Sequence, residues 1–140
     1  MIFMQTFLPY PDFKKSLQAL DYRRLGKQRV EAYQIIRILN AASISKEYRG
    51  DYRNHPAVKM WRGHINALKL YYNLSLDEWV GRGYRNNMLK MSIRGKIAYP
   101  EWFGRKNFHA AHRSNLLRKD PVYYGNLGWR ESSDLPYLWG

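Results

Sequence analysis

The chain has 140 residues, a length at which we expect one hydrophobic core and a single domain over residues 1–140. It has no cysteine, which excludes disulfides, thiolate metal sites and a cysteine nucleophile, and no apolar run of the ~20 residues needed to cross a bilayer. Its 24 lysines and arginines against 11 acidic residues give a formal charge of +13, which predicts a polyanionic partner.

Nucleic acid is the polyanion that this charge favours. A solubilising charge excess is usually smaller, and a membrane-surface protein gathers its basic residues on one helix or tract, whereas here they are spread along the chain. The first residues lack the basic region and the small-residue cleavage site of a secretory signal. We therefore expect a cytoplasmic protein that makes no membrane contact.

Two consecutive helices are predicted near the amino terminus. Asp12 follows two prolines and can cap a short helix that ends at Leu20, and Asp21 can cap a longer one from Tyr22 to about Leu39. The face of the longer helix that we expect to point inward is apolar apart from Arg29. It comprises Tyr22, Leu25, Arg29, Ala32, Ile36 and Leu39.

A single long helix is predicted from Pro56 to Gly83. Proline is favoured in the first turn of a helix, and glycine is a suitable residue at its carboxyl end. Apolar residues recur at spacings of three and four between these positions: Val58, Trp61, Ile65, Leu68, Tyr72, Leu76, Trp79 and Val80. At about 27 residues, this helix would be the scaffold of the protein.

The last third of the chain predicts one more helix and an irregular segment. After a connection over residues 86–100, a helix is expected from Arg105 to Arg118, with Phe108, Ala111, Leu116 and Leu117 as its apolar positions. The aromatic residues beyond Pro121 should pack as a cap over the helices. The predicted fold is therefore all-α and compact, built around one long central helix with an irregular, aromatic-rich carboxyl-terminal segment.

One carboxylate lies on a basic helix face. Arg24, Lys27, Gln28 and Glu31 occupy positions i, i+3, i+4 and i+7, and Glu31 is the only acid between Tyr22 and Lys46. The nearby cations should keep it ionised. One interpretation is that this face is an ordinary solvated helix surface. The other is that the carboxylate has a role other than binding DNA, because its negative charge opposes the binding of phosphates. It would then stabilise a cationic sugar or move a proton.

Two histidine-containing clusters are further candidates. His109 and His112 lie three residues apart on the predicted helix, followed by Arg113, Arg118 and Lys119. A zinc site would need a third ligand, so phosphate or base contacts, or a structural cap, are favoured over a metal. At the start of the long helix, His55 and Arg62 are polar candidates, whereas His64 is more typical of an interior histidine.

The sequence lacks the motifs of several common classes of enzyme. It contains no glycine-rich phosphate loop, no GxSxG elbow and no HExxH. The acids are scattered and form no paired-carboxylate cluster of the kind that a two-metal nuclease requires.

Over nearly its whole length the chain resembles the pyrimidine-dimer DNA glycosylase family, founded by phage endonuclease V, and its bacterial branch most closely. The resemblance rests on MQTFLPYPDF at 4–13, LDYRRLGKQRVEAYQI at 20–35, NHPAVKMWRGH at 54–64, RGYR at 82–85, FHAAHRSNLLRKDPVYYG at 108–125 and DLPYLWG at 134–140.

The resemblance implies an all-α protein that kinks duplex DNA at a lesion or modified base and flips a base, without a metal or organic cofactor. In the family, the chain's own α-amino group attacks the sugar C1′ and releases the base through an imine, which permits β-elimination of the strand. Glu31 best matches the catalytic glutamate. The resemblance implies DNA contacts at Arg24, Lys27, Gln28 and Arg29 on the basic helix and at His109, His112, Arg113 and Lys119 on the second segment. We also predict DNA contacts at Arg23, His55, Arg62 and Arg118.

The nucleophilic amine is expected on Met1, because Ile2 is too bulky for normal removal of the initiator methionine, or on Met4 if translation starts there. The predicted activity is that of a monomeric DNA glycosylase, with abasic-site lyase activity, that acts on a damaged or modified pyrimidine. Two alternatives stay open at this point. One is a non-catalytic module that binds distorted DNA or structured RNA, and the other is a metal-dependent nuclease that uses His109 and His112.

Overall fold

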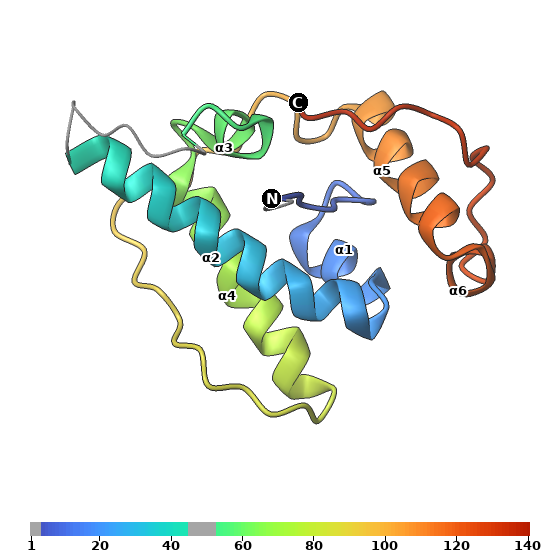
Figure 1. Ribbon diagram of the computed structural model, residues 1–140, viewed down its shortest axis with the longest axis horizontal. Coiled ribbons are helices and arrows are strands. Elements are labelled where there is room, and N and C mark those ends of the chain that lie inside the picture. The colour runs from blue at the N-terminus through green and yellow to red at the C-terminus, as the bar shows by residue number, and fades with distance from the viewer. Residues whose placement is uncertain (1–3, 45–52) are drawn as a thin grey trace.

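The structure is a computed structural model that describes residues 4–44 and 53–140, and these residues form helices and irregular segments without a strand. This confirms the all-α prediction (Figure 1). The helices are α1 (Phe13–Ala19), α2 (Tyr22–Ile44), α3 (Pro56–Trp61), α4 (Ile65–Gly81), α5 (Lys106–Lys119) and α6 (Pro121–Gly125). None of the described helices has the length and apolar character that spanning a bilayer requires.

The first two helices begin where the aspartates predict. The Asp12 side chain accepts a hydrogen bond from the Lys15 backbone N–H at 2.7 Å, and the Asp21 carboxylate is bonded to the backbone of Arg24. Helix α2 runs past Leu39 to Ile44, because residues 40–44 contain no glycine or proline to end it. Its inward face is buried at Leu25, Ala32, Ile36 and Leu39. Tyr22, placed on that face by its spacing, is instead 52% exposed.

The prediction of one long helix from Pro56 to Gly83 is wrong in one respect, because the structure divides this segment into α3 and α4. Arg62 ends α3 with an extended backbone (φ −60°, ψ 129°), and Gly63 has φ +83°, a conformation outside the right-handed helix that glycine adopts without steric cost. The apolar spacing continues across this break and therefore does not reveal it. The longest helix of the described residues is α2, with 23 residues.

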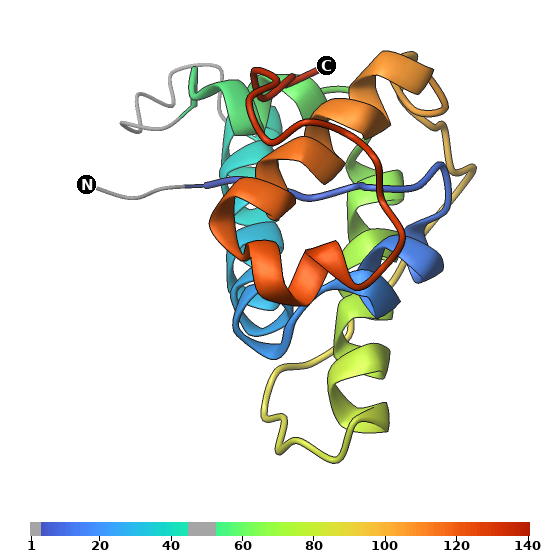
Figure 2. The same ribbon diagram turned by 90° about the vertical axis from the view of Figure 1, so that its right-hand side faces the viewer.

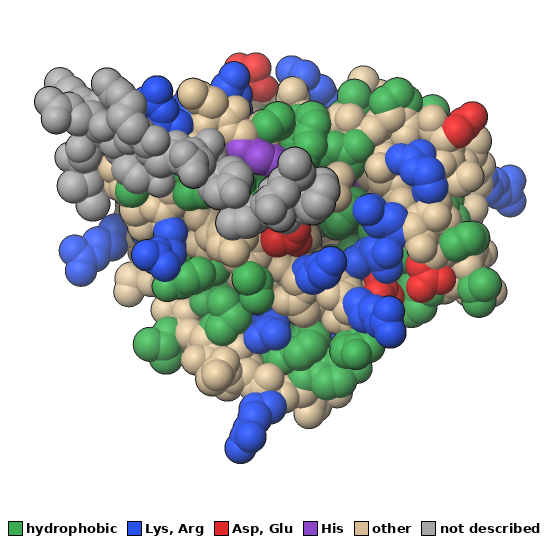
Figure 3. Space-filling view, in the orientation of Figure 1, with side chains coloured by type: hydrophobic (Ala, Val, Ile, Leu, Met, Phe, Trp, Pro, Cys, Tyr) green, Lys and Arg blue, Asp and Glu red, His purple; other side chains and the backbone are tan. Residues whose placement is uncertain are grey.

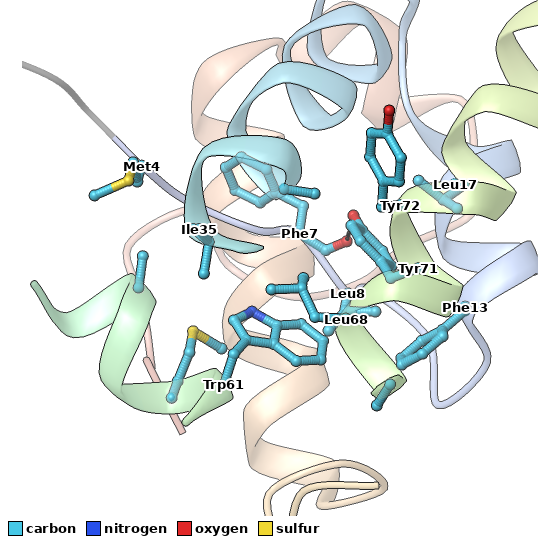
Figure 4. Close-up of a cluster of buried hydrophobic side chains, with 14 of the residues drawn as sticks. Met4, Phe7, Leu8, Phe13, Leu17, Ile35, Trp61, Leu68, Tyr71 and Tyr72 are labelled. Carbon is cyan, nitrogen blue, oxygen red and sulfur yellow. Dashed lines mark hydrogen bonds between the residues drawn. The ribbon is translucent and has the colours of Figure 1, made fainter. Parts of the chain in front are cut away.

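Helix α4 packs against both α1 and α2, and the core takes side chains from these helices, from α3 and α5, and from the amino-terminal segment (Figure 4). Its largest fully buried side chains include Trp61, Tyr71 and Tyr72. After α4, residues 84–100 run back alongside it (Figure 1). Asn73 exchanges hydrogen bonds with the backbone of Met91, and Asn66 donates to the carbonyls of Arg94 and Lys96.

The amino-terminal segment runs between α2 and α5 (Figures 1 and 2). Phe7 donates its backbone N–H to Gln28 of α2, and Leu8 donates to His112 of α5. Helix α5 agrees with its predicted bounds to one residue at each end. The irregular segment after α6 folds back along α5, and its aromatic residues Trp129, Tyr137 and Trp139 pack against the core, as expected for a cap.

Candidate nucleic-acid interface

An open groove of about 1560 Å³ lies where the start of α2, the end of α4, the α5–α6 junction and the amino-terminal segment meet. The groove is lined mainly by residues between Asp21 and Gln34. Its other walls are Gln5 and Phe7, then Trp79, Arg82 and Tyr84, and finally Lys119, Asp120 and Tyr123.

Basic side chains surround the groove. Arg23, Lys27 and Lys119 line it, and the described residues offer no hydrogen bond or ion pair to their charged groups. Arg24 also lines it but is paired with Asp21, at 3.1 Å. Figure 3 shows lysine and arginine side chains gathered over the region between α2 and the α5–α6 junction, with acidic side chains among them. The positive charges of such a surface attract a polyanion.

Glu31 lies half-buried in this groove, and its environment corrects the expectation that it is ionised at neutral pH. Burial raises the pKa of its carboxyl from 4.5 to about 7, although Lys27, the Gln5 backbone and the Gln28 side chain act in the opposite direction. The cations on the helix face do not offset the loss of water around the carboxylate. Near neutral pH, Glu31 is therefore present in both protonation states and can accept or donate a proton.

Gln28 holds Glu31 and the amino-terminal segment together. Its Nε2 donates to Glu31 Oε2 at 3.2 Å and to the Gln5 carbonyl at 2.8 Å, while its Oε1 accepts from the Phe7 N–H and the Tyr71 hydroxyl. The residue is 1% exposed. All of these polar contacts lie within the protein, so the structure favours a structural role for Gln28 over the predicted DNA contact.

Lys119 lies across the groove from α2, at the end of α5. Its ammonium group lies 6.0 Å from the centre of the Phe7 ring. Partial burial lowers its pKa, and so do the positive charges of Arg24, Arg118 and Lys27, whereas Glu31 raises it. A lysine and a glutamate from distant parts of the sequence thus share one electrostatic environment.

The two histidines of α5 are structural and do not reach the groove surface. His109 is bonded to the Leu8 carbonyl and the Gly104 N–H, and His112 to the Leu8 N–H and the Leu138 carbonyl. Burial lowers the pKa of His112 to about 3, so it is neutral. Both ring nitrogens of each histidine are occupied by backbone groups. The structure therefore favours the structural alternative over DNA or metal contacts at these two histidines.

Two arginines of α5, predicted as DNA contacts, instead fasten the carboxyl-terminal segment. Arg113 makes two hydrogen bonds of 2.9 Å to Glu131 and donates to the Pro9 carbonyl. Arg118 donates to the Ser133 carbonyl at 2.7 Å and to Asn115. These guanidinium groups are engaged within the protein and lie outside the groove lining.

Three further predicted contacts are not among the residues that line the groove. Arg29 stacks its guanidinium 4.0 Å from the Trp79 ring and donates to Asn86. His55 caps α3 by accepting the Ala57 N–H at 3.0 Å, and Arg62 donates to the Arg53 carbonyl. Each side chain is used in local structure, so the groove brings together Arg23, Arg24, Lys27, Glu31 and Lys119 from the predicted set, with Gln28 beneath them.

The groove also contains residues that sequence patterns alone do not single out. Tyr22 comes from the start of α2, and Trp79, Arg82 and Tyr84 come from the end of α4. The apolar spacing places Trp79 on the buried stripe of a long helix, and RGYR at 82–85 contributes only to the family resemblance. The excess of aromatic residues is the available signal, but it does not distinguish groove residues from core residues.

Of the two residues that could carry the nucleophilic amine, the structure describes Met4, whereas Met1 lies outside the described residues. Met4 is 1% exposed and packs in the core, next to Gln5, whose backbone is hydrogen-bonded to the Glu31 carboxylate. The chain therefore passes directly beside Glu31 at its fifth residue.

The comparisons with known proteins give one match. A family model described as pyrimidine dimer DNA glycosylase matches residues 4–92, which is more than half of the chain. This stretch includes Glu31, α2, α4 and the Trp79–Tyr84 end of the groove. No curated protein and no solved structure matches.

Proposed function

Because the chain belongs to the pyrimidine dimer DNA glycosylase family, we propose that it excises a damaged or modified pyrimidine from duplex DNA and cleaves the strand at the resulting abasic site. The observation that carries this proposal is Glu31, a half-buried carboxyl group with a pKa of about 7 in a groove lined by cations. A group that titrates near the working pH is suited to general acid–base catalysis.

The cations hold the DNA in this proposal. The charged groups of Arg23, Lys27 and Lys119 make no hydrogen bond or ion pair with a described residue, so they can neutralise phosphates without breaking such contacts. Contacts to phosphates position the duplex but do not identify the base. The lesion or modified base would be selected because its stacking or pairing is already weak, which reduces the cost of flipping.

The amine attacks in its neutral form. We assign it to the α-amino group, on Met1, or on Met4 if translation starts there, because an α-amine has a pKa of roughly 8 against roughly 10.4 for lysine. As nitrogen bonds to the sugar C1′, the C1′–N1 bond breaks, and the base leaves with the electron pair and takes up a proton. Ionised Glu31 accepts the proton that the attacking nitrogen loses. The contact between Gln5 and Glu31 supports this assignment.

Strand cleavage follows from the same covalent intermediate. Protonated Glu31 returns its proton to the ring oxygen as the sugar opens to an imine. Loss of a proton from C2′ then expels the 3′-phosphate by β-elimination, and water hydrolyses the imine to regenerate the amine. Each step uses groups of the chain and water, so the proposal requires no metal or organic cofactor.

Borohydride trapping on duplex DNA with an abasic site tests this proposal. Reduction of the imine should give a stable covalent adduct with the wild-type chain, and Glu31→Gln should form it at least ~100-fold more slowly. Glu101→Gln is the matched control, because the Glu101 side chain is 94% exposed and lies outside the groove lining. Mass spectrometry of the adduct would identify the amine.

The absence of an adduct and of base release, with DNA binding retained, would contradict the enzymatic proposal. It would favour the alternative that the basic groove serves a non-catalytic module for distorted DNA or structured RNA. An adduct mapped to Lys119 would keep the glycosylase proposal but move the nucleophile, because this lysine also faces Glu31 and has a lowered pKa.

A further inference from the structure

One end of the groove is formed by three aromatic rings that contact one another. Trp79 lies 4.5 Å from Tyr84 and 6.4 Å from Tyr22 between ring centres, and the two tyrosines are 5.6 Å apart. The Tyr22 and Trp79 rings are close to parallel, at 21°. We call these three residues the aromatic shelf.

The shelf is exposed to solvent in the groove. Tyr22 is 52% exposed and Tyr84 is 38% exposed, whereas most aromatic side chains of the core are nearly inaccessible. All three residues line the groove together with Arg23 and Lys27. Exposed aromatic rings beside unpaired cations form the combination by which proteins hold unpaired bases, because rings stack on the base while cations bind the backbone.

The surrounding structure fixes the shelf in position. The Trp79 indole N–H donates to the Arg85 carbonyl at 2.8 Å, and Arg29 stacks on the ring at 4.0 Å. The ring also lies so close to α2 at Gly26 that an added Cβ there would be 3.1 Å from it. A stacking surface that is already ordered loses little conformational entropy when a flat ligand binds.

The shelf and Glu31 are separate points in the same groove. Glu31 follows Tyr22 by nine positions in α2, which corresponds to roughly 13 Å along the helix axis and about half a turn around it. Because the shelf and Glu31 both line this groove, a DNA strand that follows the groove would pass both of them.

We propose that Tyr22, Trp79 and Tyr84 form a stacking site for a nucleobase that has left the duplex. The site takes either the base of the reacting nucleotide or a neighbouring base that loses its stacking partner when the DNA is distorted. This inference rests on the proposed function for its biological setting, but the site binds an unpaired base whether or not the chain cleaves DNA.

Equilibrium binding tests the site without catalysis. The wild-type chain should bind a duplex with one bulged, unpaired base more tightly than the same duplex fully paired. Tyr22→Leu should reduce this preference roughly tenfold, while leaving the affinity for paired DNA nearly unchanged because the cations remain. Tyr22→Phe, which keeps the ring, should retain the preference. Thermal unfolding of each variant verifies that it is folded.

Tyr99→Leu is the matched control. Tyr99 is 49% exposed and stacks on Phe103, with ring centres 5.4 Å apart, but it does not line the groove. Its substitution should leave the preference unchanged. A preference that Tyr22→Leu and Tyr99→Leu both leave intact would overturn the proposal.

Photocrosslinking identifies the base that the shelf holds. 5-Bromouracil placed in the bulge, or beside an uncleavable abasic analogue in a second duplex, should crosslink to peptides containing Tyr22, Trp79 or Tyr84. A crosslink in the second duplex assigns the site to a neighbouring base, and a crosslink in the bulge alone assigns it to the extruded base. Crosslinks confined to other peptides would overturn the site. If these crosslinks formed but borohydride trapping gave no adduct, the glycosylase proposal would be refuted and the stacking site would stand.

Discussion

At the scale of single residues, Glu31 and Gln28 show how burial changes the role of a polar group. Both lie on a helix face whose spacing indicates a solvated surface. The amino-terminal segment covers this face, so Gln28 becomes a buried hydrogen-bonding centre and Glu31 loses much of its water. Glu31 is thereby changed from an ordinary surface acid into a group that titrates near neutral pH.

The raised pKa of Glu31 predicts a dependence of stability on pH. A carboxyl whose pKa is about 7 in the folded protein and 4.5 unfolded makes its full contribution below pH 4.5 and loses it as pH rises through 7. Glu31→Gln should therefore gain stability relative to wild type between pH 5 and pH 8, with an upper limit of about 3 kcal/mol. Urea unfolding at both pH values measures this gain.

Glu101→Gln is the control for the pH experiment and should show no such trend. A gain that is equal at pH 5 and pH 8 would show that the Glu31 carboxyl is not buried as described. In the same pH range, the rate of adduct formation by the wild-type chain should include an ionisation near 7 that is absent from the residual activity of Glu31→Gln.

At the scale of elements, the break between α3 and α4 determines where the two helices lie. Gly63 has φ +83°, and the chain changes direction there, so that α4 packs along α1 and α2 while α3 lies near the other end of α2 (Figure 1). Helix α4 consequently ends at the groove, where Trp79 reaches α2 at Gly26 and Arg82 donates to carbonyls of α1. The aromatic shelf therefore depends on this connection.

Gly63→Ala should destabilise the fold by about 1–2 kcal/mol, because a residue with a Cβ resists a positive φ. No atom lies within 4 Å of the added Cβ, so the cost comes from the backbone alone. Gly81→Ala is the matched control, since Gly81 lies in α4, has no positive φ and also has open space around its Cβ. It should be neutral or slightly stabilising. Equal unfolding midpoints for the two variants would contradict this account.

At the scale of the whole molecule, the charge of +13 does not act as one uniform field. Several cations are engaged in holding the structure together: Arg113 and Arg118 fasten the carboxyl-terminal segment, and Arg82 pairs with Glu78. The groove cations that make no hydrogen bond or ion pair with a described residue are the ones available for phosphates.

This distribution predicts which cations set the salt dependence of DNA binding. Replacing Arg23, Lys27 and Lys119 by glutamine lowers the formal charge from +13 to +10, and should reduce the slope of log K against log salt by about 0.9 for each phosphate that is no longer neutralised. Replacing Lys14, Lys15 and Lys59, which are exposed outside this groove, changes the charge equally. If affinity titrations gave both triple variants the same slope, net charge rather than the groove would govern binding.

Local sequence signals are sufficient for much of the fold. The aspartate caps and apolar spacing predict α1, the start of α2 and the bounds of α5, because these features act within a few residues. The same spacing predicts one helix through Gly63, since apolar periodicity records which side is buried and not whether the axis continues. The family resemblance and the choice of Glu31 also come from the sequence.

What the sequence by itself determined is the partner class, the helical fold and the lone carboxylate on a basic face, because composition and helical spacing are local properties. Only the tertiary structure decided which groove cations make no ion pair, that His109 and His112 are buried structural groups, and that Tyr22, Trp79 and Tyr84 meet in one groove. The physical reason is that the burial of a side chain and its hydrogen-bond and ion-pair partners depend on residues that are distant in the chain. The amino-terminal segment beside Glu31 and α4 beside Tyr22 create environments that no local pattern encodes.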